Sequence, residues 1–212
     1  MKASSERGFT LIEVLVAMVI MAIMAVMAWQ GVDGIVRTRN ASQERLEKTL
    51  RLNTVIAQWD QDLASIQETA STGDKKIVPL ALSCDGATVR LTRRTPDGLQ
   101  VVAWSLRPGT NGSNWERWAG PAVTTVGALQ DSWLRSLQLQ GGEPGNLRTL
   151  TGLSAWQVYF YQGNGWANCQ STGDLQSNGN NLALPKGVRI VLSFEAGSGF
   201  NGELTRDTLV RP

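Results

Sequence analysis

The strongest feature of the hydrophobic pattern is an apolar run at residues 9–29, in which Thr10 and Glu13 are the only polar side chains. About 20 helical residues, rising about 1.5 Å each, cross the hydrocarbon core of a bilayer, so this run predicts a transmembrane helix. A carboxylate inside an inserted helix costs about 2.5–3.5 kcal/mol. Because Glu13 has no basic residue in its own run, we expect its charge to meet a partner from elsewhere.

A second helical pattern follows a polar stretch at residues 37–45. Apolar side chains then recur at alternating steps of four and three residues, at Leu52, Ile56, Trp59, Leu63 and Ile66. This is the spacing of one face of a helix. Together the two patterns predict one long helix, whose first half is anchored and whose second half packs on a domain. A cluster of turn-forming residues predicts its end near residues 71–73.

Beyond residue 73 the period of the pattern becomes two, which is typical of β-strands. Strands are expected at residues 88–92, 99–106, 156–161, 187–195 and 204–210. The first two flank a Pro-Asp-Gly turn and predict a hairpin, whereas residues 123–139 fit either a short helix or a strand. The predicted fold class is α+β, with a long N-terminal helix, its first half transmembrane, packed on an antiparallel β-sheet domain.

The charge balance favours a single-pass membrane protein with an N-terminus in the cytoplasm. Lys2 and Arg7 precede the apolar run, which predicts a translocated, periplasmic domain, although Arg37 and Arg39 beyond the run weaken the asymmetry. The formal net charge is only +2. Such a balance gives no reason to expect a nucleic-acid partner.

The composition argues against catalysis. The chain has no histidine, which removes the commonest general base and metal ligand. Gly197, Gly199 and Gly202 have the spacing of a dinucleotide-binding motif, but a strand is expected after them where that motif needs a helix. The polar stretch at residues 162–181 carries one carboxylate, Asp174, and a single carboxylate in a polar loop is more often solvated than bound to calcium. We expect no catalytic residue, no cofactor and no metal; whether the polar stretch binds anything is left open.

The two cysteines, Cys84 and Cys169, belong to no metal-binding or redox motif. An oxidising compartment allows them to form a disulfide, which would stabilise the domain by about 4–5 kcal/mol on the chain-entropy model. The alternative is two unpaired buried thiols, because spacing alone does not show proximity.

Eight tryptophans suggest both a core and a contact surface. Trp29 suits a membrane interface and Trp59 belongs to the helical stripe. Core positions are expected for Trp104, Trp133 and Trp156, which lie in apolar runs. Contact with a partner protein is expected for Trp115, Trp118 and Trp166, which lie among turn-forming and polar residues.

The N-terminus resembles that of type IV prepilins, a family that includes the pilins and the pseudopilins of type II secretion. The resemblance rests on Gly8, the Phe-Thr-Leu-Ile-Glu sequence that ends at Glu13, and the unbroken apolar run. It implies that residues 1–8 are a leader removed by the prepilin peptidase and that Phe9 becomes the N-methylated mature N-terminus. It also implies that Glu13 pairs with the terminal ammonium of a neighbouring subunit.

The later sequence is similar to the J-type minor pseudopilins of type II secretion. The similarity lies in Trp156, Trp166, the Leu184–Pro185 pair before the strand at residues 187–195, and the final strand. The segment at residues 101–109, with Trp115 and Trp118 following, is also similar.

The J-type resemblance implies a minor pseudopilin near the tip of a periplasmic pseudopilus, which helps to initiate assembly and protein export. Its implied partners are other minor pseudopilins, the major pseudopilin, the prepilin peptidase, the inner membrane and a secreted protein. The implied regions are a leader (residues 1–8), a transmembrane and assembly helix (9–30), its periplasmic continuation (31–71) and a β-rich domain (72–212). A minor pilin of a type IV or DNA-uptake pilus, and a membrane-anchored periplasmic binding module, are the alternatives.

Overall fold

The computed structural model describes residues 8–68, 80–110, 112–170 and 184–210. The chain divides into two compact units, Met1–Thr49 and Leu50–Pro212. Helix α1 (Leu11–Ala64) contributes residues to both units. Among the described residues it is the one helix that is long and apolar enough to cross a membrane, and its apolar side chains from Leu11 to Val36 are exposed.

Helix α1 ends at Ala64, earlier than the predicted end near residues 71–73, which lie outside the described residues. The next residues leave the helix because their backbone pairs with a strand. Gln67 donates to the carbonyl of Thr92 at 2.9 Å, and the carbonyl of Ser65 accepts from Arg94 at 2.8 Å. The apolar stripe therefore continues past the helix, and Ile66 is still buried.

The strands of the second unit confirm the predicted antiparallel domain. Their bounds are β1 (Leu82–Cys84), β2 (Thr88–Thr95), β3 (Gly98–Arg107), β4 (Ser113–Ala119), β5 (Asn146–Gln162), β6 (Gly165–Asn168), β7 (Gly187–Phe194) and β8 (Glu203–Leu209). The predicted hairpin is β2–β3, with Thr95 opposite Gly98. The first part of the polar stretch forms β6, and residues 171–181 of that stretch lie outside the described residues.

Residues 123–139, which fitted either a helix or a strand, contain helix α2 (Val126–Leu137). The hydroxyl of Thr125 caps its N-terminus by accepting from the amide of Ala128 at 3.4 Å. This cap satisfies one of the free amides of the first turn. Leu129 and Trp133 form the buried side of the helix, so the apolar spacing follows the helical period.

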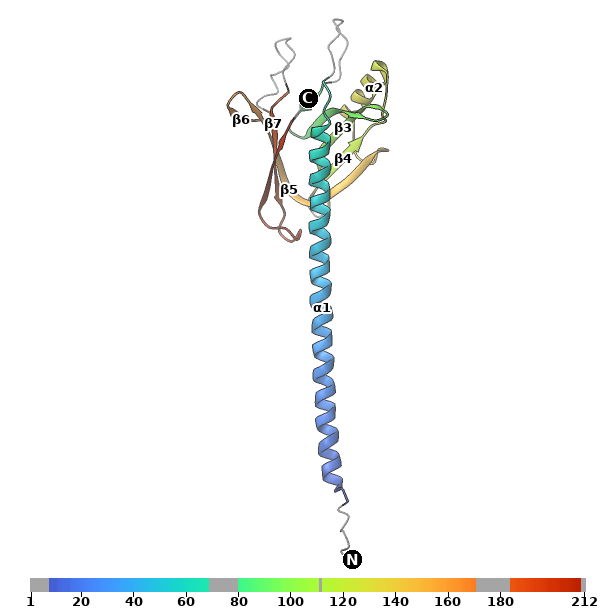
Figure 1. Ribbon diagram of the computed structural model, residues 1–212, viewed down its shortest axis with the longest axis vertical. Coiled ribbons are helices and arrows are strands. Elements are labelled where there is room, and N and C mark those ends of the chain that lie inside the picture. The colour runs from blue at the N-terminus through green and yellow to red at the C-terminus, as the bar shows by residue number, and fades with distance from the viewer. Residues whose placement is uncertain (1–7, 69–79, 111, 171–183, 211–212) are drawn as a thin grey trace, which may run out of the picture. The chain divides into compact units, whose positions relative to one another are not determined.

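All strand pairs are antiparallel in the order β1-β2-β3-β4-β5-β7-β8, and β6 pairs with β5. The long strand β5 connects two parts of the sheet, because its beginning pairs with β4 and its end pairs with β6 and β7. Figure 1 shows the last turns of α1 running between the β3–β4 part and the β5–β7 part. One side of the curled sheet therefore covers these helical turns.

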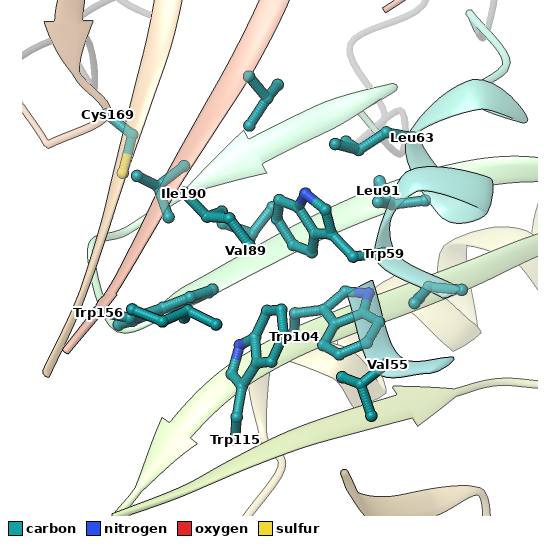
Figure 2. Close-up of a cluster of buried hydrophobic side chains, with 14 of the residues drawn as sticks. Val55, Trp59, Leu63, Val89, Leu91, Trp104, Trp115, Trp156, Cys169 and Ile190 are labelled. Atoms are coloured by element: carbon teal, nitrogen blue, oxygen red, sulfur yellow. The ribbon is translucent and has the colours of Figure 1, made fainter. Parts of the chain in front are cut away.

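Two apolar cores result. The larger core joins residues 52–66 to the inner side of the sheet, and Figure 2 shows Trp59 of α1 among Trp104, Trp115 and Trp156 of the strands. The smaller core joins α2 to β3 and β4 and contains Val101, Ala103, Trp118, Leu129 and Trp133. Strands β3 and β4 are thus covered on both faces.

Candidate assembly and docking sites

The N-terminal end of α1 carries the residues expected to act in processing and assembly. Phe9 follows Gly8 just before the start of the helix, and it is 89% exposed. A carboxylate oxygen of Glu13 accepts from the amide of Thr10 at 2.9 Å and from the Thr10 hydroxyl at 2.8 Å. The amide of Glu13 donates back to that hydroxyl at 3.4 Å. This reciprocal pattern is a capping box, which fixes the start of the helix.

The other end of α1 carries a carboxylate in the opposite situation. Asp62 is fully buried, and its carboxylate accepts from both Arg93 on β2 and Arg117 on β4 at 2.7 Å. The indole of Trp104 on β3 donates to it at 2.8 Å, and the Gln58 amide donates at 3.0 Å. Burial lowers the pKa of Arg93 from its usual value, an effect that the Asp62 charge opposes. Buried charges are stable only when they are paired in this way.

A second carboxylate of α1 contacts the other part of the sheet. Asp60 accepts from the guanidinium of Arg206 at 2.7 Å and from the hydroxyl of Thr208 at 2.6 Å, both on β8. The Asp60 contact raises the pKa of Arg206 above its ordinary value. Within one helical turn, Asp60 therefore contacts β8 and Asp62 contacts strands β2 to β4.

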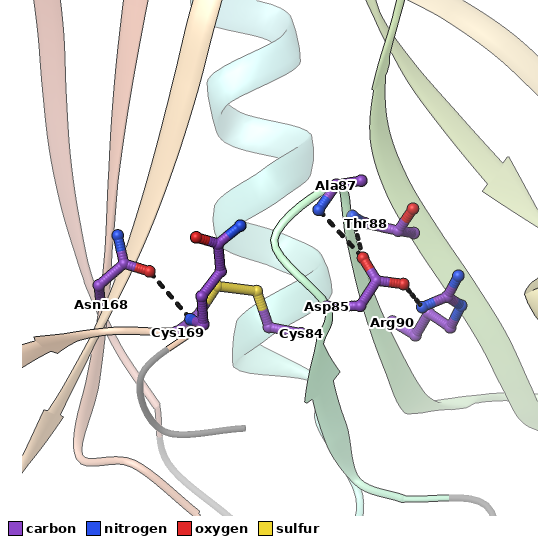
Figure 3. Close-up of a disulfide and its surroundings, with 8 residues drawn as sticks. Cys84, Asp85, Ala87, Thr88, Arg90, Asn168 and Cys169 are labelled. Atoms are coloured by element: carbon purple, nitrogen blue, oxygen red, sulfur yellow. Dashed lines mark hydrogen bonds and ion pairs between the residues drawn. A yellow bond between two sulfur atoms is a disulfide. The ribbon is translucent and has the colours of Figure 1, made fainter. Parts of the chain in front are cut away.

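Cys84 and Cys169 form a disulfide in the structure, with their Cα atoms 5.8 Å apart. Cys84 ends β1 and Cys169 follows β6, so the bond links the edges of the two parts of the sheet. The amide of Cys169 also donates to the carbonyl of Val158 at 2.9 Å. Figure 3 shows the disulfide beside the turn that begins at Asp85. Of the two alternatives that the sequence leaves open, a disulfide or two unpaired thiols, the structure has the disulfide.

Asp85 holds the turn beside the disulfide. One of its oxygens accepts from the amides of Ala87 and Thr88, and the other accepts from Arg90 at 2.6 Å. Arg90 also donates to the carbonyl of Ser136 near the end of α2 at 3.1 Å. Burial raises the pKa of Asp85, but the bonds from Arg90 and Thr88 outweigh burial and leave the pKa below its ordinary value.

Trp115 and Trp118 lie in strand β4, and the expectation that they lie in polar turns is wrong. Trp115 is fully buried, with its ring 4.4 Å from that of Trp104, and Trp118 is 5% exposed. The reason is that the polar residues between them are themselves paired: Arg117 with Asp62 and Glu116 with Arg107. Neither tryptophan offers a surface to a partner in this structure.

The remaining tryptophans follow the sequence expectations more closely. Trp104, Trp133 and Trp156 are buried, as predicted. Trp166 on β6 is 36% exposed and packs edge-on against Tyr161 at 5.3 Å. The guanidinium of Arg189 lies 4.3 Å from its ring centre and is held by Asp207 at 2.6 Å. The aromatic pair and the ion pair form one ordered cluster on β5–β8.

The apolar spacing that predicts α1 gives no sign of the Asp62 cluster. Only the position of Asp62 in the sequence predicts that it is buried. It lies three residues after Trp59 and next to Leu63, on the buried side of the helix. An acidic residue in a buried stripe needs basic partners. The sequence contains several arginines that could pair with Asp62, and the fold shows that Arg93 and Arg117 are the partners.

Two known family models match the chain. Residues 3–29 match the prokaryotic N-terminal methylation motif, and residues 30–201 match protein J of the type II secretion system. The chain belongs to the protein J family of type II secretion. No curated protein matches it.

As a J-type protein, the chain is a minor pseudopilin of the type II secretion system. The methylation motif and the exposed apolar helix indicate a single-pass anchor in the inner membrane. Membership also implies assembly with other pseudopilins and processing by the prepilin peptidase. The assignment favours secretion over the two alternatives, the pilus and the anchored binding module.

Proposed function

We propose that this minor pseudopilin acts near the tip of the periplasmic pseudopilus, where it helps to initiate assembly and so supports protein export. The prepilin peptidase removes residues 1–8 after Gly8, and Phe9 becomes the N-methylated N-terminus. The N-terminus faces the cytoplasm before cleavage. Residues 9–30 form the transmembrane and assembly helix, residues 31–71 continue into the periplasm with the helix ending at Ala64, and residues 72–212 are the periplasmic domain.

The observation that carries this proposal is the apolar segment of α1 that starts directly after the Gly8–Phe9 junction. Its large apolar side chains from Leu11 to Val36 are exposed, and the methylation motif covers its first part. Such a surface is stable only in lipid or against other apolar helices. We propose that this segment serves in both settings in turn, first in the membrane and then in the filament.

The proposal assigns Glu13 to the step between these two settings. Its carboxylate is exposed, and in the capping box it accepts hydrogen bonds from the amide and the hydroxyl of Thr10. Cleavage after Gly8 creates a new ammonium at Phe9. Pairing the ammonium of one subunit with Glu13 of the next neutralises two charges that are costly in an apolar medium.

Processing is tested by the mass of the protein from cells with and without the prepilin peptidase. We expect the mature chain to begin at Phe9 and to carry one methyl group, and the chain from peptidase-free cells to keep residues 1–8. A mature chain that begins elsewhere would contradict the assignment of the leader.

We also propose that the cluster around Trp166 contacts a partner pseudopilin or a secreted protein. Partly exposed tryptophan and arginine are typical of residues that dominate binding energy, and Asp207 already holds Arg189 in place. Trp166→Ala is expected to weaken co-purification with partner pseudopilins about 10-fold, equivalent to about 1.4 kcal/mol. The matched control is Val126→Ala, an exposed apolar residue on α2. Equal effects of the two variants would contradict this surface.

A further inference from the structure

The contacts between α1 and the sheet are of two kinds. The first is a stripe of apolar side chains, in which Leu52, Val55, Trp59 and Leu63 are buried. Apolar attraction is non-directional and depends on buried area. Because the stripe repeats about every turn, a shift by one turn, about 5.4 Å, replaces many of its contacts with similar ones.

The second kind is directional. The carboxylate of Asp62 accepts bonds from three successive strands, through Arg93 on β2, Trp104 on β3 and Arg117 on β4. Arg117 donates through two nitrogens, at 2.7 Å and 2.9 Å. A shift of one turn would take the carboxylate out of reach of these donors and leave two buried charges, Asp62 and Arg117, and the partly buried Arg93 unpaired. Unpaired buried charges cost several kcal/mol each.

Asp60 restricts rotation as well. It is two residues from Asp62, which places the two side chains about 200° apart around a helix with 3.6 residues per turn. Asp60 contacts Arg206 and Thr208 on β8, whereas Asp62 contacts β2, β3 and β4. Rotating the helix to improve one set of contacts breaks the other.

We propose that Asp62, Arg93 and Arg117 form a positioning site that selects one register of residues 50–64 of α1 on the sheet. Replacing a buried ion cluster with apolar residues of similar volume is often neutral or stabilising, so stability alone does not account for such a site. What the apolar stripe lacks is discrimination between neighbouring registers. The value of a fixed register for assembly rests on the function proposed above. If the helix enters the filament, a fixed register gives the domain a single axial position along that helix.

The test uses the full-length protein in detergent and replaces the ion cluster with Asp62→Leu, Arg93→Met and Arg117→Leu together. Register is read by cysteine pairs that share Thr208→Cys. Asp60→Cys reports the native register, because Asp60 and Thr208 are in direct contact. Ile56→Cys and Ala64→Cys report shifts of one turn in either direction. Cross-linked peptides are identified by mass spectrometry, which separates them from the Cys84–Cys169 disulfide.

With the ion cluster intact, we expect cross-linking of residue 60 with 208 and only background for the two shifted pairs. In the apolar triple variant, we expect a cooperative unfolding transition within about 5 °C of the parent and a shifted cross-link at a yield comparable with the native one. The native cross-link alone in the folded triple variant would overturn the proposal.

A second variant keeps the test decisive if the triple variant does not fold. Asp62→Asn with Arg93→Gln and Arg117→Gln keeps the shapes and removes the charges. If neither variant folds, the ion cluster is a source of stability and the proposal is overturned. The cross-links do not depend on secretion, so a failure of the assembly role of Glu13 would leave their result unchanged.

Discussion

The beginning and the end of helix α1 carry similar apolar side chains and use them in opposite ways. From Leu11 to Val36 these side chains are exposed, and Trp29 is 76% exposed. Between residues 50 and 64 the stripe is buried under the sheet, and Trp59 is fully buried. The exposed beginning of the helix fits a bilayer or neighbouring apolar helices, whereas its buried end packs on its own domain.

The carboxylates of the helix repeat this contrast. Glu13 is exposed and bonds within its own first turn, whereas Asp62 is buried and bonded by side chains of three strands. A buried charge is satisfied within the fold, while a charge at the edge of a membrane segment is available to a second molecule. The comparison therefore separates Glu13, for which we propose a role in assembly, from Asp62, which serves the fold.

We expect the largest difference in the free energy of unfolding between variants of the two tryptophans of α1, Trp59 and Trp29. Trp59→Ala should lower the free energy of unfolding of the domain by about 3–5 kcal/mol, because it removes the centre of a packed core. Trp29→Ala should change it by less than about 0.5 kcal/mol. Denaturant unfolding of the full chain in detergent, followed by near-UV circular dichroism, measures both. Similar losses in the two variants would break the comparison.

The disulfide is expected to have the next largest effect, and only on the domain. Cys84→Ser with Cys169→Ser should cost about 2–5 kcal/mol, because the bond closes a long loop between two parts of the sheet. The helical content of the membrane segment should not change, since Cys84 and Cys169 lie in the second unit. Labelling of the unreduced parent with a thiol reagent is the control. Quantitative labelling of both cysteines there would contradict the disulfide.

The smallest expected effect is on the pH dependence of the domain. The pKa of Asp85 is lowered in the folded state, so its stabilisation is complete above the pKa of an unfolded aspartate, about 3.9. It is lost as the pH falls through the folded pKa. Because half of the Asp85 side chain is exposed, screening limits the effect to below about 1 kcal/mol. Melting between pH 5 and pH 2 should show a shallower loss for Asp85→Asn, and identical slopes would contradict this.

Much of the fold could be predicted because its signals are local. The membrane segment depends on one apolar run, and the β2–β3 hairpin depends on alternation around a Pro-Asp-Gly turn. The methylation motif is also a short local pattern, and the family comparison matches it over residues 3–29; the cleavage site after Gly8 and the role of Glu13 stay predictions. These features do not depend on long-range contacts.

The errors occurred where a neighbour distant in sequence decides the outcome. The polar neighbours of Trp115 and Trp118 predict contact with a partner protein, but α1 and α2 cover the two faces of β4. The position of Asp62 in the stripe indicates burial, but only the fold shows that Arg93 and Arg117 are its partners. No local pattern carries this information, because burial of a polar residue depends on which partner the topology supplies.

The central claim, that α1 is the assembly device and Glu13 its contact, is tested most directly by Glu13→Ala in cells that express the whole secretion system. We predict that the variant inserts and is cleaved after Gly8, but no longer co-purifies with partner pseudopilins and does not restore secretion to a deletion strain. Glu47→Ala, on an exposed part of the same helix, should behave like the parent. Normal co-purification and secretion by Glu13→Ala would contradict the account.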